Sequence, residues 1–159
     1  MTTAAVVLAA GGSRRLGRTK QLESWGDSNL LGHVLSRTFE FPVDEVWVVL
    51  GHDADRILAE TDLGDAYVVD NLEWEEGIAS SLRVGLDALT RLSRCDRALI
   101  VIGDQPDVPV EMVVELIESH GRSGKPVTVP KYRYNWGNPV LVDRALWPRL
   151  MSLEGDEGA

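Results

Sequence analysis

The sequence has a single cysteine, Cys95, so it cannot form an internal disulfide bond and it fits a reducing compartment. No apolar run approaches the length that a transmembrane helix needs. The first residues also lack the basic segment with which a signal peptide begins. We therefore expect a cytoplasmic protein that does not enter a membrane.

Positive charge is scarce, because 16 Lys and Arg residues stand against 25 Asp and Glu residues and the formal net charge is −9 at pH 7. Nucleic acids and acidic membrane surfaces bind clustered cations, so the composition argues against both partners. One local exception is informative. Four of the 16 cations, Arg14, Arg15, Arg18 and Lys20, fall within seven positions. In an acidic chain this cluster predicts a local anion-binding site.

The order of apolar segments predicts an α/β fold. Short runs rich in β-branched residues alternate with segments of helical periodicity, which is typical of a mostly parallel, Rossmann-like sheet with helices on both faces. We expect strands at 4–10, 45–50, 66–69, 97–102, 126–129 and 139–142, and helices at 28–39, 53–60, 78–92, 109–120 and from 144 onward. Ligands of such sheets bind at the carboxyl ends of the strands, so the loops after residues 10, 50, 69 and 102 are the candidate site.

The first of these loops combines small residues with cations: residues 8–22 read LAAGGSRRLGRTKQL. Glycines let the backbone turn its N–H groups toward an anion, and the cations supply the charge that a triphosphate needs. A plain strand-to-helix turn would explain the glycine pair alone, but the added cations favour phosphate binding. The dinucleotide fingerprint fails because Ser13 takes the place of its second glycine. The P-loop pattern fails because Arg18 replaces its lysine, so a P-loop-like hydrolase is kept only as the rival enzyme.

An acidic side chain follows the strand at 97–102, where the sequence continues Gly103-Asp104-Gln105-Pro106. A carboxylate in this place is suited to holding Mg²⁺, and Pro106 stiffens the loop by restricting the residue before it. A lone aspartate after a strand is also common in turns and caps, and we expect Asp107 to cap the next helix.

A third segment, residues 71–82, reads NLEWEEGIASSL and opens the helix at 78–92. Gly77 and the small residues after it leave free N–H groups that can receive polar ligand atoms. Ser81 is the first choice for a ligand contact and Ser80 the second, whereas Trp74 is expected to pack. The three histidines have no spaced partners for a Ser-His-Asp triad.

These segments resemble the small nucleotidyltransferases related to molybdenum cofactor cytidylyltransferase, the MobA-like NTP transferases. The first loop is similar to their signature L-A-A-G-x-S-x-R-M/L-G-x-x-K-x-L at every defining position. Gly-Asp-Gln-Pro is similar to their metal motif, and the third segment to N-x-x-W-x-x-G-x-x-x-S-L. The pair Ala9-Ala10 favours the cytidylyl branch over the guanylyl branch, which usually has Ala-Gly-Gly.

The resemblance implies roles for individual residues. Arg15 and Lys20 contact the triphosphate, and Asp104 holds the Mg²⁺ ion; these three form the predicted catalytic set. The residues implied to bind the nucleotide are Leu8, Ala9, Ala10, Gly11, Gly12, Ser13, Arg15, Lys20, Asn71, Gly77, Ser80 and Ser81.

The C-terminal part resembles the family in two further places. Gly137-Asn138-Pro139 is similar to the segment G-H-P-V/I-L that borders the acceptor pocket, with Asn138 in place of the usual histidine. Residues 153–159 are similar to the turn L-x-G-D-x-G-A. Family members continue into a strand bearing D-I/V-D-T-P, which can give the metal a second acid. From this resemblance we expect residues 1–159 to form one nucleotidyltransferase domain that lacks this strand. Its absence would mean either that the chain is shortened or that the activity is compromised.

The expected reaction is attack of an acceptor phosphate on the α-phosphorus of a nucleoside triphosphate. A phosphate monoester is largely ionised at neutral pH, so no protein base is required. The resemblance implies transfer of CMP from CTP to molybdopterin and a transient contact with a molybdoenzyme. A sugar 1-phosphate or another phosphorylated small molecule as acceptor, and a nucleotide-binding module without catalysis, stay open as alternatives.

Overall fold

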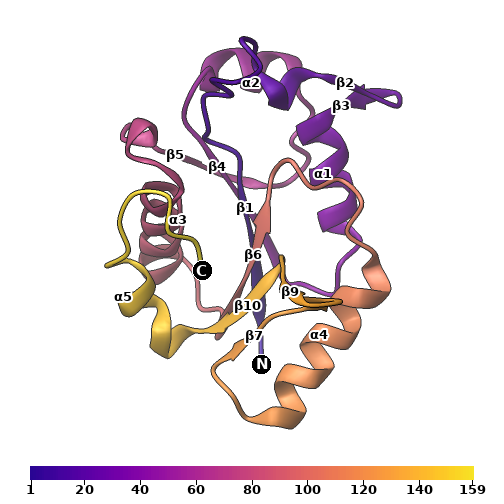
Figure 1. The fold of residues 1–159 in the computed structure, drawn as a ribbon, viewed down its shortest axis with the longest axis vertical. Coiled ribbons are helices and arrows are strands. Elements are labelled where there is room, and N and C mark those ends of the chain that lie inside the picture. The colour runs from indigo at the N-terminus through magenta and orange to yellow at the C-terminus, as the bar shows by residue number, and fades with distance from the viewer.

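The computed structural model describes residues 1–159 and is built around one six-stranded sheet in the order β5–β4–β1–β6–β10–β7 (Figure 1). The strands are β1 (Thr3–Leu8), β4 (Glu45–Leu50), β5 (Tyr67–Asp70), β6 (Arg97–Ile102), β7 (Val127–Thr128) and β10 (Val140–Asp143). The first four pair in parallel, whereas β10 is antiparallel to both β6 and β7. The expected α/β class with a mostly parallel sheet is confirmed. Strand order reverses between β1 and β6.

Helices cover both faces of this sheet, as expected. They are α1 (Leu30–Phe39), α2 (Ala54–Glu60), α3 (Ile78–Leu92), α4 (Val110–Ser123) and α5 (Trp147–Leu150). Side chains of α1, α2 and α4 pack with Ala5 and Val7 on one face, and those of α3 and α5 pack with Ala4 and Val6 on the other. Because β1 faces helices on both sides, all six of its residues are buried.

Several local features differ from the expectations. The first strand ends at Leu8, so residues 9–19 are free to form a loop. Helix α1 begins at Leu30 and is capped by Asn29, whose side chain accepts from the Gly32 N–H at 2.9 Å, in place of Ser28. Pro148 lies in the first turn of the short α5, where its missing N–H is tolerated.

Two small hairpins were not foreseen. One joins β2 (Ser24–Trp25) to β3 (Ser28–Asn29), and the other joins β8 (Lys131–Tyr132) to β9 (Asn135–Trp136). Two-residue strands carry too few residues for a period-2 pattern. The one local signal is Gly26-Asp27 at the first turn, where Gly26 has a φ of 56°. No helix of the protein is both long enough and apolar enough to span a membrane.

Candidate active site

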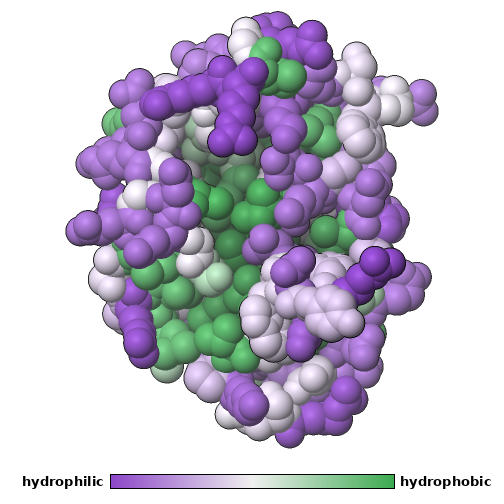
Figure 2. Space-filling model, in the orientation of Figure 1, coloured by the Kyte–Doolittle hydropathy of each residue, from purple (hydrophilic) through white to green (hydrophobic).

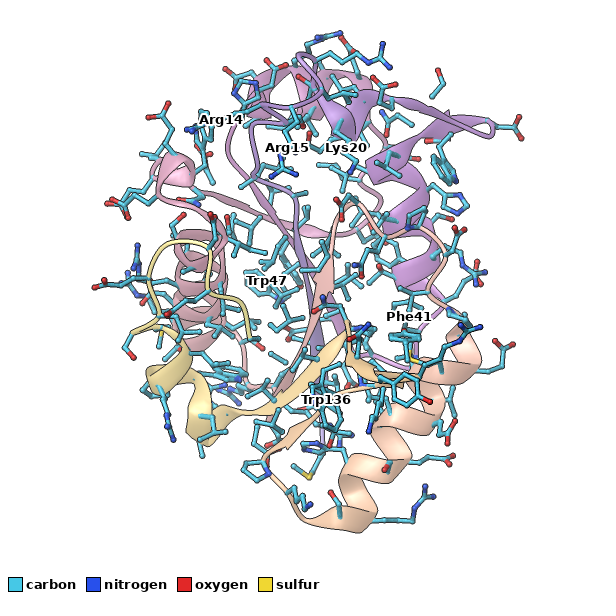
Figure 3. All side chains as sticks on the ribbon, viewed as in Figure 1. Arg14, Arg15, Lys20, Phe41, Trp47 and Trp136 are labelled. Carbon is cyan, nitrogen blue, oxygen red and sulfur yellow. The ribbon has the colours of Figure 1, made fainter.

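Two loops far apart in the sequence meet at the carboxyl ends of β1 and β6. The short 3-10 helix η1 (Lys20–Leu22) follows the β1 loop, and Asp104 lies two residues beyond β6. Lys20 Nζ donates to Asp104 Oδ2 at 2.9 Å, and about half of each side chain is exposed (46% and 45%). Since β1 and β6 are the strands between which the order reverses, the pair stands where ligands of open α/β sheets bind. Figure 3 shows Lys20 and Arg15 at the same end of the sheet.

A cavity of about 890 Å³ opens at this place, a size within the usual range for small-molecule sites, roughly 300–1,000 Å³. Its walls come from the loop after β1, the start of α3, the end of β6 and the C-terminal turn. The lining residues are Leu8, Ala9, Gly11, Gly12, Ser13, Arg14, Arg15, Leu16, Lys20, Gln21, Leu30, Trp74, Glu75, Glu76, Gly77, Ile78, Ser81, Ile102, Gly103, Asp104 and Asp156.

Gln21 fixes the shape of the glycine-rich loop. Its side-chain Nε2 donates to the carbonyl oxygens of Ala9 at 2.8 Å and Gly11 at 3.0 Å. The side chain is buried, and its Oε1 is the one buried side-chain polar atom of the protein that has no hydrogen-bond partner. Ser13 adds a second tie, because its Oγ accepts from the Lys20 N–H at 3.1 Å. The loop is therefore preorganised, and its carbonyl groups turn toward Gln21.

Trp74 supports the same loop from the other side. A Cβ atom built on Gly12 would lie 2.7 Å from Trp74 Cζ3, and one built on Gly51 would lie 2.6 Å from Trp74 Cβ. The two glycines are thus required by close packing against the indole. His52 meets Trp74 edge to face, with the ring centroids 4.8 Å apart. Trp74 packs as expected, and it also lines the cavity.

Asn71 anchors the beginning of α3. It is completely buried, and its Nδ2 donates to Ser80 Oγ at 2.9 Å and to Ser81 Oγ at 3.0 Å. Its Oδ1 accepts from the Glu73 N–H at 3.0 Å. These three bonds hold the segment between β5 and α3 against the helix, so that Ser81 is presented at the cavity wall.

The C-terminal turn closes the same wall. Gly77 has a φ of 100°, and a side chain there would collide with the Gly155 carbonyl group. The Ala79 N–H donates to that carbonyl oxygen at 3.0 Å. This contact brings Asp156 to the cavity.

Comparison with known proteins decides the family. The model of the MobA-like NTP transferase domain matches residues 5–159, nearly the whole chain. The chain belongs to this family.

Individual relatives match over most of this chain. Nicotine blue oxidoreductase of Paenarthrobacter nicotinovorans is 30% identical over 165 residues, which cover 97% of this chain and 78% of that protein. The bifunctional protein GlmU of Streptomyces griseus is 33% identical over 129 residues, which cover 79% of this chain but only 27% of that protein.

Solved structures are similar over the whole fold. The Mycobacterium tuberculosis Rv0371c homolog from Mycobacterium sp. strain JC1 is 35% identical with a TM-score of 0.86, and the match covers 98% of this chain and 77% of that one. Rv0371c from Mycobacterium tuberculosis H37Rv, solved in complex with manganese, is 30% identical with a TM-score of 0.78. This match covers 98% of this chain and 78% of that one.

Most residues that the family signature marks come together in the fold. The predicted residues that line the cavity are Leu8, Ala9, Gly11, Gly12, Ser13, Arg15, Lys20, Gly77, Ser81 and Asp104. Ala10, Asn71 and Ser80 are buried behind its wall and do not line it. Gly137, Asn138 and Pro139 also lie outside the lining, next to the start of β10. Asp107 makes no capping hydrogen bond to α4.

Several lining residues were not singled out from the sequence. Gln21 had no clear signal, since a polar residue beside Lys20 is equally expected on the surface. Asp156 had one only through the C-terminal turn motif. Glu75 and Glu76 had none, because acidic residues in an acidic chain are not informative.

Four carboxylates line the cavity, those of Glu75, Glu76, Asp104 and Asp156. No three His, Cys, Asp or Glu side chains are grouped as a metal site. Magnesium, however, is usually bound by one or two carboxylates together with substrate phosphates and water. Asp104, at the end of a buried strand and facing a cavity lined by Arg15 and Lys20, fits that kind of site.

Proposed function

We propose that this protein is a metal-dependent nucleotidyltransferase that moves a nucleoside monophosphate from a nucleoside triphosphate to a phosphorylated small molecule. The observation that carries the proposal is that Lys20 and Asp104 line one cavity, with Lys20 Nζ 2.9 Å from Asp104 Oδ2. A site that must hold both a polyanion and a divalent cation needs a cation and a carboxylate within reach of the same ligand.

In the proposed reaction, an oxygen of the acceptor phosphate attacks the α-phosphorus. One P–O bond forms there, the bond from the α-phosphorus to the bridging oxygen breaks, and pyrophosphate leaves with the bond electrons. The acceptor oxygen is already ionised near neutral pH, so no proton has to move to a protein base. Positioning and charge neutralisation then supply the catalysis.

Three side chains share two tasks in this scheme. Arg15 and Lys20 balance the charge of the β- and γ-phosphates and of the departing pyrophosphate. Asp104 would hold Mg²⁺, which when bound supplies positive charge to the α-phosphate and acceptor oxygens. The loop from Ala9 to Ser13, tied by Gln21, offers its backbone to the nucleotide.

At a finer level we propose CTP as the donor and molybdopterin as the acceptor, with a transient contact to a molybdoenzyme. Support for this comes from the Ala9-Ala10 pair and the family resemblance. A sugar 1-phosphate is the alternative acceptor, since GlmU is also among the relatives. We also propose that the protein is located in the cytoplasm.

The test is a screen of ATP, CTP, GTP and UTP with Mg²⁺ or Mn²⁺ against phosphorylated pterin and sugar acceptors, read as pyrophosphate. Release that requires the acceptor supports nucleotidyl transfer. Orthophosphate formed without an acceptor would instead indicate a hydrolase, and triphosphate binding without any product would indicate a binding module. Because one relative is named an oxidoreductase, oxidation of NADH and NADPH is followed in parallel; redox turnover without pyrophosphate would overturn the proposal.

A further inference from the structure

The hairpin of β8 and β9 concentrates aromatic and positive groups on the surface. Its six residues, 131–136, read KYRYNW. Tyr134 is 92% exposed and Trp136 70% exposed. Neither Lys131 nor Arg133 forms an ion pair, although the protein carries nine more negative than positive charges. Large aromatic side chains that lie together on a surface are typical of interaction sites, and the unpaired cations beside them favour a ligand that carries negative charge.

The two strands are joined by a tight turn. Arg133, the first of its two residues, has a φ of +55°, as two-residue hairpin turns require. The Lys131 ammonium lies 5.3 Å from the centre of the Trp136 ring, which orients the indole while leaving most of it exposed.

The hairpin is fixed to the protein and is not a free loop. The Tyr132 hydroxyl donates to the Asn138 carbonyl oxygen at 3.1 Å. Burial raises the pKa of the Tyr132 phenol above its ordinary value. Gly137 packs beneath the Tyr132 ring, where any side chain would collide with it. The predicted acceptor segment 137–139 therefore serves, in the free protein, as the base of the hairpin.

Sheet register places this base beside the candidate active site. Val140, the first residue of β10, pairs with Ile100 of β6, only four residues before Asp104. Since β6 lies between β1 and β10, the glycine-rich loop and the hairpin flank the Asp104 end of β6 from opposite sides.

The space-filling view agrees with this placement. Figure 2 shows an apolar hollow on this face, with hydrophilic atoms above it and pale atoms to its lower right, where Figure 1 shows β9. In Figure 3, Arg15 and Lys20 lie above this region and Trp136 lies below it.

We propose that the β8–β9 hairpin selects the acceptor: it binds a phosphorylated compound with a planar unsaturated ring, which stacks on Trp136 while Lys131 and Arg133 balance its negative charge. The inference rests on the proposed function and adds the side chains that select among its acceptors. A nucleotide in the cavity would approach Asp104 from the β1 side, which leaves the β10 side to the acceptor. Sugar phosphates have no ring face that stacks as well, so the hairpin favours aromatic acceptors over them.

The test measures binding of two phosphate monoesters by equilibrium dialysis, with Mg²⁺ and saturating α,β-methylene CTP present to fill the nucleotide cavity. Flavin mononucleotide is the planar probe and glucose 1-phosphate the probe without an aromatic ring. Stacking on an aromatic side chain changes affinity by about 5- to 150-fold. Trp136→Ala should therefore weaken flavin mononucleotide binding by that factor and leave glucose 1-phosphate unchanged.

Trp25→Ala is the matched control, because Trp25 is the exposed tryptophan of the other hairpin. It should alter neither affinity. Equal affinity of wild type and Trp136→Ala for flavin mononucleotide would overturn the inference. It would also be overturned if wild type bound flavin mononucleotide with a Kd above about 1 mM, or no more tightly than it binds glucose 1-phosphate. Failure of the proposed function is seen separately, as absence of CTP-analogue binding or of pyrophosphate release.

Discussion

Replacing Asn71 by alanine removes a side chain that organises the nucleotide cavity from behind its wall. Asn71 matches a family position expected to contact the nucleotide, yet it is fully buried and outside the cavity lining. Its amide instead spans the gap between Glu73 and the serines of α3. We predict that Asn71→Ala lowers stability first and nucleotide affinity as a consequence.

The size of the effect follows from three hydrogen bonds. Each buried bond contributes about 1 kcal/mol net, and a partner left unsatisfied costs about 1–3 kcal/mol. Ser80 Oγ keeps its bond to the Gly77 carbonyl at 2.7 Å, so only part of its hydrogen bonding is lost. The expected loss is about 2–3 kcal/mol. For a domain of this size, 1 kcal/mol corresponds to about 2–4 °C in Tm, so Tm should fall by about 4–12 °C.

Thermal unfolding followed by circular dichroism measures this loss, and titration calorimetry with CTP and Mg²⁺ measures affinity. Asn135→Ala is the matched control, because Asn135 is exposed on β9 and makes no side-chain hydrogen bond. Its Tm should change by about 1 °C at most. If Asn71→Ala unfolds at the same temperature as Asn135→Ala, the assignment of Asn71 as an anchor is wrong.

Two further predictions concern the glycine-rich loop and the ion pair. Gly12→Ala should destabilise the protein by about 1–3 kcal/mol in urea unfolding, because its Cβ would press on Trp74. Gly11→Ala is the control and should not destabilise it, because no atom lies within 4 Å of a Cβ at that position. Equal losses of stability in the two variants would contradict this. Lys20→Met should strengthen Mn²⁺ binding in the absence of nucleotide, measured by electron paramagnetic resonance, because the ammonium no longer neutralises Asp104, and should weaken CTP binding. Weaker Mn²⁺ binding in the variant would refute competition at Asp104.

Three of the four parallel strands could be predicted because they are buried on both faces. Strands β1, β4 and β6 each appear in the sequence as an uninterrupted apolar run, and α3 carries a clear helical period. The direction of β10 could not be predicted, since a four-residue apolar strand looks the same in both orientations.

The candidate site was predictable where backbone geometry demands particular residues. Gly12 and Gly77 mark close approaches, and three of the clustered cations, Arg14, Arg15 and Lys20, line the cavity. Interactions across the chain left no such signal: the ties from Gln21 to the loop carbonyls and from Gly155 to the start of α3 join segments that only the fold brings together. The same holds for Asn71, whose buried amide is indistinguishable in sequence from a ligand contact.

The most direct test of the account is the turnover of Asp104→Asn. The Lys20–Asp104 pair is half exposed and contributes only about 0–1 kcal/mol to stability, so the variant should remain folded and should still bind the triphosphate. Acceptor-dependent pyrophosphate release should fall at least about 100-fold, while Asp107→Asn, three residues further along the same loop, should retain wild-type rates. Unchanged release by Asp104→Asn would contradict the claim that this carboxylate and Lys20 act on one nucleotide.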